Sequence, residues 1–148
     1  MHDAVAPAPV TEYLARVGAA GARVVPLTGD ASDRRYVRVI ADDGSRAVLA
    51  VHAARFTYAT LPFVNVAQLL SEMPVPVPRI LGHAGDLGVL ALEDLGDVTL
   101  QAHVGTNAAA AHASLYRLAV TFIDTIQRRG RELAGARYVP YGIAFDED

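Results

Sequence analysis

The sequence predicts an α+β protein in which a five-stranded antiparallel sheet and one packed helix are followed by further helices. Short runs rich in β-branched residues, separated by turn-forming residues, occupy residues 23–51 and 79–92. Amphipathic runs with helical spacing occupy residues 61–73 and 107–129. The chain has 148 residues, of which 52% are hydrophobic and 20% charged, so it is long and apolar enough to bury a core.

The N-terminal part is predicted to be a short helix followed by an antiparallel three-stranded meander. Thr11 caps the helix over Thr11–Val17, and Gly18 ends it. The segment Asp42–Ser45 contains an Asp-Gly pair, which is typical of a tight hairpin turn. The three strands of the meander are Arg23–Leu27, Arg34–Ile40 and Ala47–Val51.

A second helix is predicted over Leu61–Met73. Thr60 is its N-cap, Pro62 suits the first turn, and Pro74 ends the helix. The segment Pro74–Pro78 then forms an extended connector. The apolar face of the helix is expected to consist of Phe63, Val66, Leu70 and Met73.

The remaining segments complete the sheet and begin a helical part. Arg79–His83 and Leu87–Leu92 are predicted strands that pair around a short turn. Leu100–Val104 is a short helix, and Asn107–Arg129 is a long one that Gly130 terminates.

The long helix carries an apolar stripe that needs a partner. Residues 131–148 supply few apolar groups to cover it, so the stripe is a candidate surface for self-association. The stripe consists of Leu115, Leu118, Ala119, Phe122, Ile123 and Ile126.

Charge and composition exclude several classes of function. The formal net charge is −3 at pH 7, which does not favour non-specific binding to nucleic acid. The chain has no cysteine, so thiolate metal sites and cysteine nucleophiles are excluded. All 13 basic residues are arginine, which excludes lysine-dependent phosphate loops and Schiff-base lysines. No apolar stretch reaches the roughly 18 residues that a membrane span needs, and no secretory signal opens the chain, so we expect a cytoplasmic protein.

The turn between the first two predicted strands is a candidate phosphate-binding loop. A loop between antiparallel strands has the geometry of a nucleotide lid, whose backbone N–H groups close over phosphates. Rossmann and Walker loops instead join a strand to a helix. An ordinary hairpin made of turn-forming residues explains the same segment. The candidate residues are Gly29, Asp30, Ala31, Ser32 and Asp33.

Three arginines directly after this loop are further candidates. Arg34, Arg35 and Arg38 carry guanidinium groups, which bind phosphate oxygens through charge-assisted hydrogen bonds. Alternation along the strand places Arg38 with Tyr36 on one face and the valines beside them on the other. The alternative is that each arginine is a solvated surface residue.

The connector from the sheet to the helical part is the last candidate segment. The backbone groups of Glu93, Asp94 and Leu95 would read an adenine edge if they line an apolar cleft. The alternative is a plain strand-to-helix loop in which Asp94 caps the segment that follows.

The histidines give no sign of a metal site or of a catalytic acid. No His-Glu-x-x-His motif occurs, and His103 and His112 are too far apart to share one helical face. The segment His83–Asp86 has the wrong order for a catalytic His-x-Asp motif and is interpreted as a turn.

Taken in order, these segments resemble one family. The run Leu27–Arg38 is similar to the nucleotide-loop signature of aminoglycoside-phosphotransferase-like small-molecule kinases. Within that family it looks most like the bacterial cell-wall amino-sugar kinases, which phosphorylate N-acetylmuramate and N-acetylglucosamine at the anomeric position. The segments Pro62–Leu70, Pro74–Pro78 and Leu92–Gly96 match the same group in the same order.

The resemblance implies a protein-kinase-like N-lobe with its hinge over residues 1–96 and the helical start of a C-lobe over residues 97–148. It implies ATP with Mg²⁺ as the donor, an amino sugar as the acceptor, and a cytoplasmic role in peptidoglycan recycling. It places Gly29–Asp33 over the phosphates and Glu93–Leu95 beside the adenine.

Two departures from the family pattern limit what the chain is expected to do. The strand Ala47–His52 lacks the lysine that usually pairs with the nucleotide phosphates, and Arg34, Arg35 or Arg38 is the candidate substitute. The family's His-x-Asp motif with its following asparagine does not occur in these 148 residues. We therefore expect the chain alone to be inactive, with the magnesium ligands in a C-lobe that it lacks.

Two other functions stay open. The chain is alternatively a non-catalytic nucleotide-binding or regulatory module, which would be monomeric and would melt cooperatively. If the loop is only a hairpin, nothing binds, and millimolar ATP would cause no thermal shift.

Overall fold

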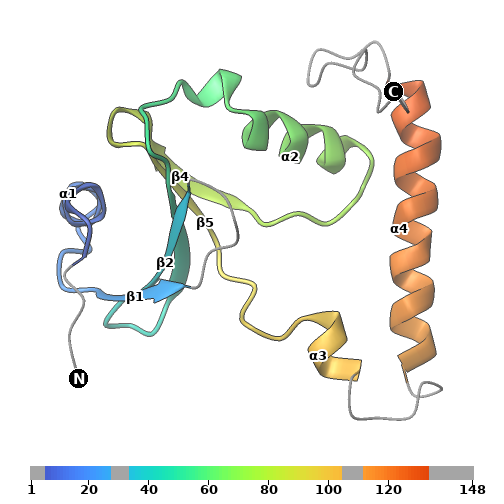
Figure 1. Ribbon diagram of the computed structural model, residues 1–148, viewed down its shortest axis with the longest axis horizontal. Coiled ribbons are helices and arrows are strands. Elements are labelled where there is room, and N and C mark those ends of the chain that lie inside the picture. Colours follow the sequence, from blue (N-terminus) through green and yellow to red (C-terminus); the bar gives the residue numbers. More distant parts are fainter. Residues whose placement is uncertain (1–5, 28–33, 105–111, 134–148) are drawn as a thin grey trace, which may run out of the picture. The chain divides into compact units, whose positions relative to one another are not determined.

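A computed structural model describes residues 6–27, 34–104 and 112–133 of the chain. These residues form two compact units (Figure 1). The sheet unit contains the described residues up to Leu61 together with Pro78–Leu95, and the helical unit contains Pro62–Val77 together with those from Gly96 onward. The predicted α+β class is confirmed, and the division into domains at residue 96 stays a prediction.

The sheet unit is built on a five-stranded sheet in which every neighbouring pair is antiparallel, as predicted. The strand order is β1-β2-β3-β5-β4, so β5 lies between β3 and β4. The hairpin between β2 and β3 turns at Gly44, whose φ of 82° suits the predicted Asp-Gly turn. The strands are β1 Arg23–Leu27, β2 Arg35–Ile40, β3 Arg46–Val51, β4 Ile80–Ala84 and β5 Val89–Glu93.

Helix α1, Ala8–Arg16, begins earlier than the predicted Thr11. Pro7 is the N-cap and Pro9 lies in the first turn. Backbone N–H groups in the first turn have no acceptor within the helix, so a proline there costs no helical hydrogen bond. The predicted start was wrong because Thr11 lies inside the helix and does not cap it. The end is as predicted, because Gly18 adopts a left-handed φ of 74° directly after the helix.

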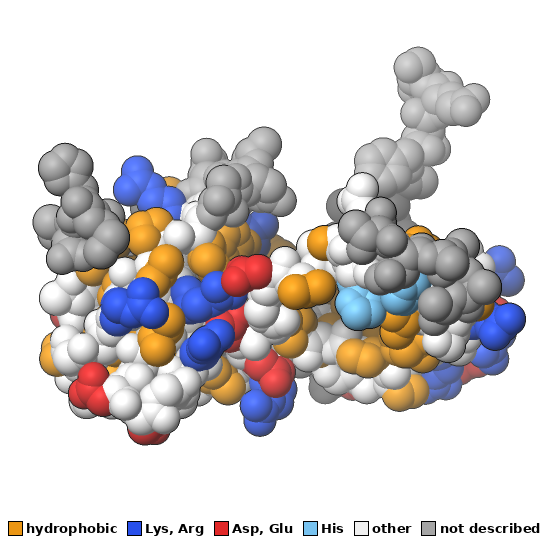
Figure 2. Space-filling model, turned by 90° about the horizontal axis from the view of Figure 1, so that it is seen from below, with side chains coloured by type: hydrophobic (Ala, Val, Ile, Leu, Met, Phe, Trp, Pro, Cys, Tyr) orange, Lys and Arg blue, Asp and Glu red, His pale blue; other side chains and the backbone are white. Residues whose placement is uncertain are grey.

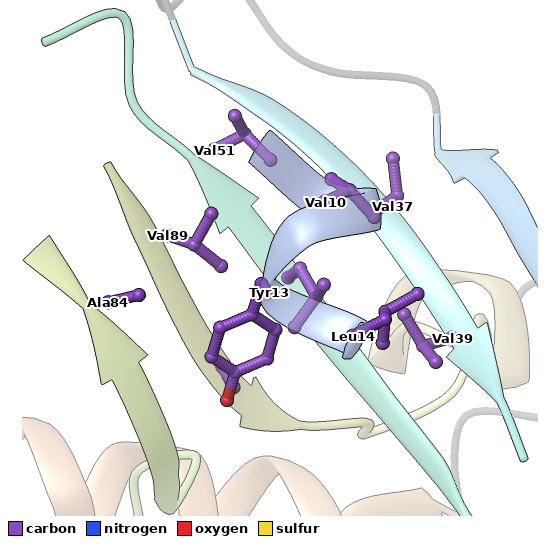
Figure 3. Close-up of a cluster of buried hydrophobic side chains, with 10 residues drawn as sticks. Val10, Tyr13, Leu14, Val37, Val39, Val51, Ala84 and Val89 are labelled. Carbon is purple, nitrogen blue, oxygen red and sulfur yellow. The ribbon is translucent and has the colours of Figure 1, made fainter. Parts of the chain in front are cut away.

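The core of the sheet unit lies between α1 and one face of the sheet (Figure 3). Val10 and Leu14 of α1 meet Val37, Leu49 and Val89, which come from three different strands. Each such side chain, when fully buried, contributes about 1.5–3 kcal/mol. A helix of 9 residues is marginal in water by itself, so this packing is what stabilises α1.

Helix α2, Pro62–Glu72, belongs to the helical unit. Its buried residues are Val64 and Leu69, whereas Val66 of the predicted apolar face is 40% exposed. The predicted face was wrong in this respect because apolar residues occur on nearly every side of α2, so spacing alone does not select one. Met73, which follows α2, is buried as predicted.

Two further helices complete the helical unit. Helix α3, Leu100–Val104, has the predicted bounds, and helix α4 spans Ala113–Glu132. The predicted end at Gly130 was wrong, because α4 continues through this residue. A Cβ added at Gly130 would lie 3.8 Å from the Met73 methyl group, so the glycine lies beside the end of α2. The predicted start of this helix at Asn107 lies outside the described residues.

The surface of α4 is strongly apolar. Leu118 is 49% exposed and Ile123 is 56% exposed, as the unpartnered stripe predicts. Figure 2 shows one face of the molecule, on which hydrophobic side chains lie at the surface among polar ones. The exposed large hydrophobic residues of α4 are Leu115, Tyr116, Leu118, Val120, Ile123 and Ile126. Among the described residues, no helix combines the length and apolarity needed to cross a membrane.

Candidate functional site

The register of the sheet divides the predicted site residues between its two faces. Arg38 pairs with Val48, and Val48 pairs with Leu92, so these residues form one row across β2, β3 and β5. We call the face that carries them the Tyr36 face, and the opposite face, which carries Val37, the α1 face. The Tyr36 face consists of Tyr36, Arg38, Val48, Ala50, Leu90 and Leu92.

Two predicted site residues, Arg38 and Asp94, form an ion pair with each other. Nε of Arg38 lies 2.7 Å from Oδ2 of Asp94, and Nη2 donates a hydrogen bond of 2.9 Å to Oδ1. The side chains are 12% and 5% exposed, so the pair is nearly buried. Asp94 directly follows β5, and alternation places it on the Tyr36 face two positions beyond Leu92. The pair therefore ties β2 to the start of the connector.

Glu93, the next predicted site residue, is held by Arg79. The Glu93 backbone N–H donates to the Arg79 carbonyl oxygen at 2.8 Å, and the Arg79 backbone N–H donates to Oε2 of Glu93 at 3.1 Å. The backbone hydrogen bond first, and then the Arg79 side chain, lower the pKa of the Glu93 carboxyl. Leu95 follows on the connector with 70% of its surface exposed.

The three predicted arginines differ in position. Arg35 pairs with Val51 and is exposed on the α1 face, away from Arg38. Arg34 directly precedes β2, and continued alternation places it on the Tyr36 face. Arg35 pairs with Val51, so one further step of the same register places Arg34 opposite His52. The pKa of His52 is lowered first by burial and then by the charge of Arg34.

Sequence reasoning missed His52 as a member of this face. The signal was present, because His52 follows Ala50 at the two-residue spacing of β3 and so shares its face.

The predicted phosphate loop lies outside the described residues, so its contacts stay a prediction. The strands on either side of it are described: Leu27, the last residue of β1, pairs with Tyr36 of β2 in an antiparallel register. The prediction that two antiparallel strands flank this segment is confirmed. The loop residues concerned are Gly29, Asp30, Ala31, Ser32 and Asp33.

Two further histidines contact each other. His103 of α3 and His112, which precedes α4, have ring centroids 5.1 Å apart, which the distance between them in the sequence did not predict. They come from separate segments, so helical spacing does not limit their contact. Within the described ranges, no group of three or more metal-ligating side chains exists. The interpretation of His83–Asp86 as a turn is correct only in part: His83 and Ala84 end β4, and the chain turns in a 3-10 helix over Gly85–Leu87, where Asp86 pairs with Arg16.

Comparison with curated proteins finds two bacterial sugar kinases. The chain is 41% identical over 78 residues to an N-acetylmuramate/N-acetylglucosamine kinase of Pseudomonas aeruginosa, a match that covers 53% of this chain and 22% of the relative. It is 34% identical over 104 residues to a protein of the same name from Neisseria meningitidis, covering 70% of this chain and 30% of the relative. The predicted resemblance to the amino-sugar kinases is confirmed. The chain matches less than a third of the length of either relative.

Two other comparisons bear on the fold. No family profile matches the chain. No solved structure matches it either, so the assignment of the sheet unit to a kinase-like lobe stays a prediction.

Proposed function

We propose that this chain is the nucleotide-binding part of an ATP-dependent phosphotransferase of the aminoglycoside-phosphotransferase-like family, acting on a sugar or amino sugar. The similarity to two kinases of the same name carries the proposal. The chain corresponds to only part of each relative, so phosphorylation of an amino sugar and a role in peptidoglycan recycling are proposed for a protein that also contains a C-lobe.

The Tyr36 face is the proposed nucleotide site. Its middle is apolar, with Ala50 and Leu90 side by side and both buried. Its ends are charged, with Arg34 near the predicted phosphate loop and Arg38 at the connector. A strand rises about 3.3 Å per residue, so these two arginines are roughly 13 Å apart along β2. This spacing allows the base to lie near the connector while the phosphates lie near Arg34.

The ion pair changes which arginine is the best substitute for the absent lysine. Arg38 is engaged with Asp94, and Arg35 lies on the α1 face. Arg34, which directly precedes β2 on the Tyr36 face and borders the predicted phosphate loop, is the proposed phosphate ligand, and Arg38 is proposed to position the connector that carries Leu95. Mg²⁺ would be held by the nucleotide phosphates together with residues of the C-lobe, as the family resemblance implies.

The second candidate is a non-catalytic nucleotide-binding or regulatory module. No His-x-Asp motif occurs in the 148 residues, so the sequence has no evident base to orient an acceptor hydroxyl. Nucleotide binding is common to both candidates, and only phosphoryl transfer distinguishes them.

The test is nucleotide binding by the 148-residue chain, measured by calorimetry with Mg-ATP. Arg34→Gln is expected to weaken binding about tenfold or more through the lost charge-assisted hydrogen bond. Arg35→Gln is the matched control, because it removes the same charge one residue away but on the opposite face. No binding to the wild-type chain at millimolar Mg-ATP would overturn the proposal. Phosphorylation of N-acetylglucosamine by the chain itself, followed by phosphorus NMR, would exclude the non-catalytic alternative.

A further inference from the structure

His52 is anchored at the end of β3 on the Tyr36 face. Its backbone N–H donates to the Gly88 carbonyl oxygen at 2.8 Å, which extends the pairing of β3 with β5 by one step. The Phe56 ring contacts the imidazole in an edge-on arrangement, with ring centroids 5.0 Å apart. These contacts hold the imidazole in one place, on the same side of the sheet as Ala50.

The Nε2 atom of His52 is buried and has no hydrogen-bond partner among the described residues. Buried polar side-chain atoms are nearly always paired, and an unpaired one calls for a specific explanation, such as a bound ion or a functional role. A neutral imidazole can present this nitrogen either as a donor or as an acceptor, depending on its tautomer.

Arg34 is a charged neighbour of His52. It lies opposite His52 across β2 and β3, and it is the charged side chain that acts on the imidazole within the described part of the chain. Burial and this charge lower the pKa of His52, so the imidazole is neutral at pH 7 when no anion is present. The other neighbours, the Phe56 ring and the Gly88 backbone, carry no charge.

We propose that His52 and Arg34 together bind an oxyanion, which is a phosphate group of the nucleotide if the proposed function holds. The Nε2–H of His52 donates one hydrogen bond to the anion, and the guanidinium of Arg34 donates charge-assisted ones. A bound phosphate favours the imidazolium form, so binding takes up a proton at His52. The histidine thus does the work expected of the absent lysine, but with a charge that depends on pH.

The experiment measures the binding of tripolyphosphate and of Mg-ATP to the full chain by calorimetry between pH 5.5 and 8. His52→Gln is expected to weaken tripolyphosphate binding about tenfold and to abolish the part of the proton uptake that belongs to the protein. His103→Gln is the matched control, because His103 is an exposed histidine of the helical unit. His52→Lys is expected to restore affinity while flattening its pH dependence, which a purely structural role of His52 would not produce.

The outcomes separate this inference from the proposed function. If the wild-type chain binds Mg-ATP and His52→Gln binds both ligands equally well, the inference is wrong and the proposed function stands. If tripolyphosphate binding depends on His52 while Mg-ATP does not bind, the anion site stands and the nucleotide function is overturned. If the wild-type chain binds neither ligand, both fail. Circular dichroism of each variant shows that a loss of binding does not come from unfolding.

Discussion

Breaking the ion pair between Arg38 and Asp94 is expected to destabilise the sheet unit strongly. Both side chains are nearly buried, and the carboxylate receives two close contacts from the guanidinium. Replacing Asp94 by Asn leaves the Arg38 charge without a full countercharge, which typically costs about 3–5 kcal/mol at a buried site. For a chain of this size, each kcal/mol lowers Tm by about 2–4 °C, so a fall of roughly 6–20 °C is expected.

A double substitution distinguishes the ion pair from simple loss of packing. Arg38→Met with Asp94→Leu removes both charges, and buried pairs replaced by apolar residues of similar volume often lose little stability. The double variant should therefore be more stable than Asp94→Asn alone. Urea unfolding followed by circular dichroism measures the free energy of unfolding of each variant.

The chain contains a matched control for this experiment. Arg16 and Asp86 form an ion pair whose shortest contact is also 2.7 Å, but their side chains are 45% and 55% exposed. Asp86→Asn should change the urea midpoint little, because solvent screens an exposed pair. The reasoning fails if Asp94→Asn unfolds at the same urea midpoint as the wild type. It also fails if the double variant loses as much unfolding free energy as Arg38→Met and Asp94→Leu lose together.

Three further predictions concern other parts of the chain. Gly88→Ala should destabilise the chain far more than Gly18→Ala in urea unfolding. Both glycines have positive φ, but only at Gly88 would a Cβ lie 2.9 Å from a backbone carbonyl oxygen. An equal loss of unfolding free energy in the two variants would contradict this close approach. Hydrogen bonds from Arg79 lower the pKa of Glu93. Their contribution to stability is therefore complete well above the ordinary value of 4.5 and is lost as the pH falls through the lower pKa of the folded state. Glu93→Gln should reduce the acid sensitivity of Tm below about pH 4.5. Leu118→Glu should abolish any concentration-dependent association seen by sedimentation, and a wild-type chain that stays monomeric at all concentrations would refute self-association through the α4 stripe.

Local chemistry explains where sequence reasoning succeeded. The five strands lie within two residues of their predicted bounds, because β-branched runs and turn residues act over a few positions. Gly44 and Gly18 adopt the left-handed conformations that their turn and helix end require. Alternation also correctly separated Tyr36 from Val37.

Sequence reasoning failed where neighbours from elsewhere in the chain make the choice. Gly130 is a plausible helix end by local preference, yet α4 continues through it beside Met73. The buried residues of α2 include Val64 and Leu69, because an apolar helix presents several candidate faces and packing selects among them.

By itself, the sequence determined the strands, their turns and the face of β2 to which Arg38 belongs, since backbone alternation is a local property. The tertiary structure alone decided that Arg38 pairs with Asp94 and that Arg34 lies opposite His52. Both arrangements depend on which strands pair and in which register, and packing across the whole sheet selects these. The face on which a side chain lies thus follows from its position in its own strand, whereas its contact partner depends on a strand that is distant in the sequence.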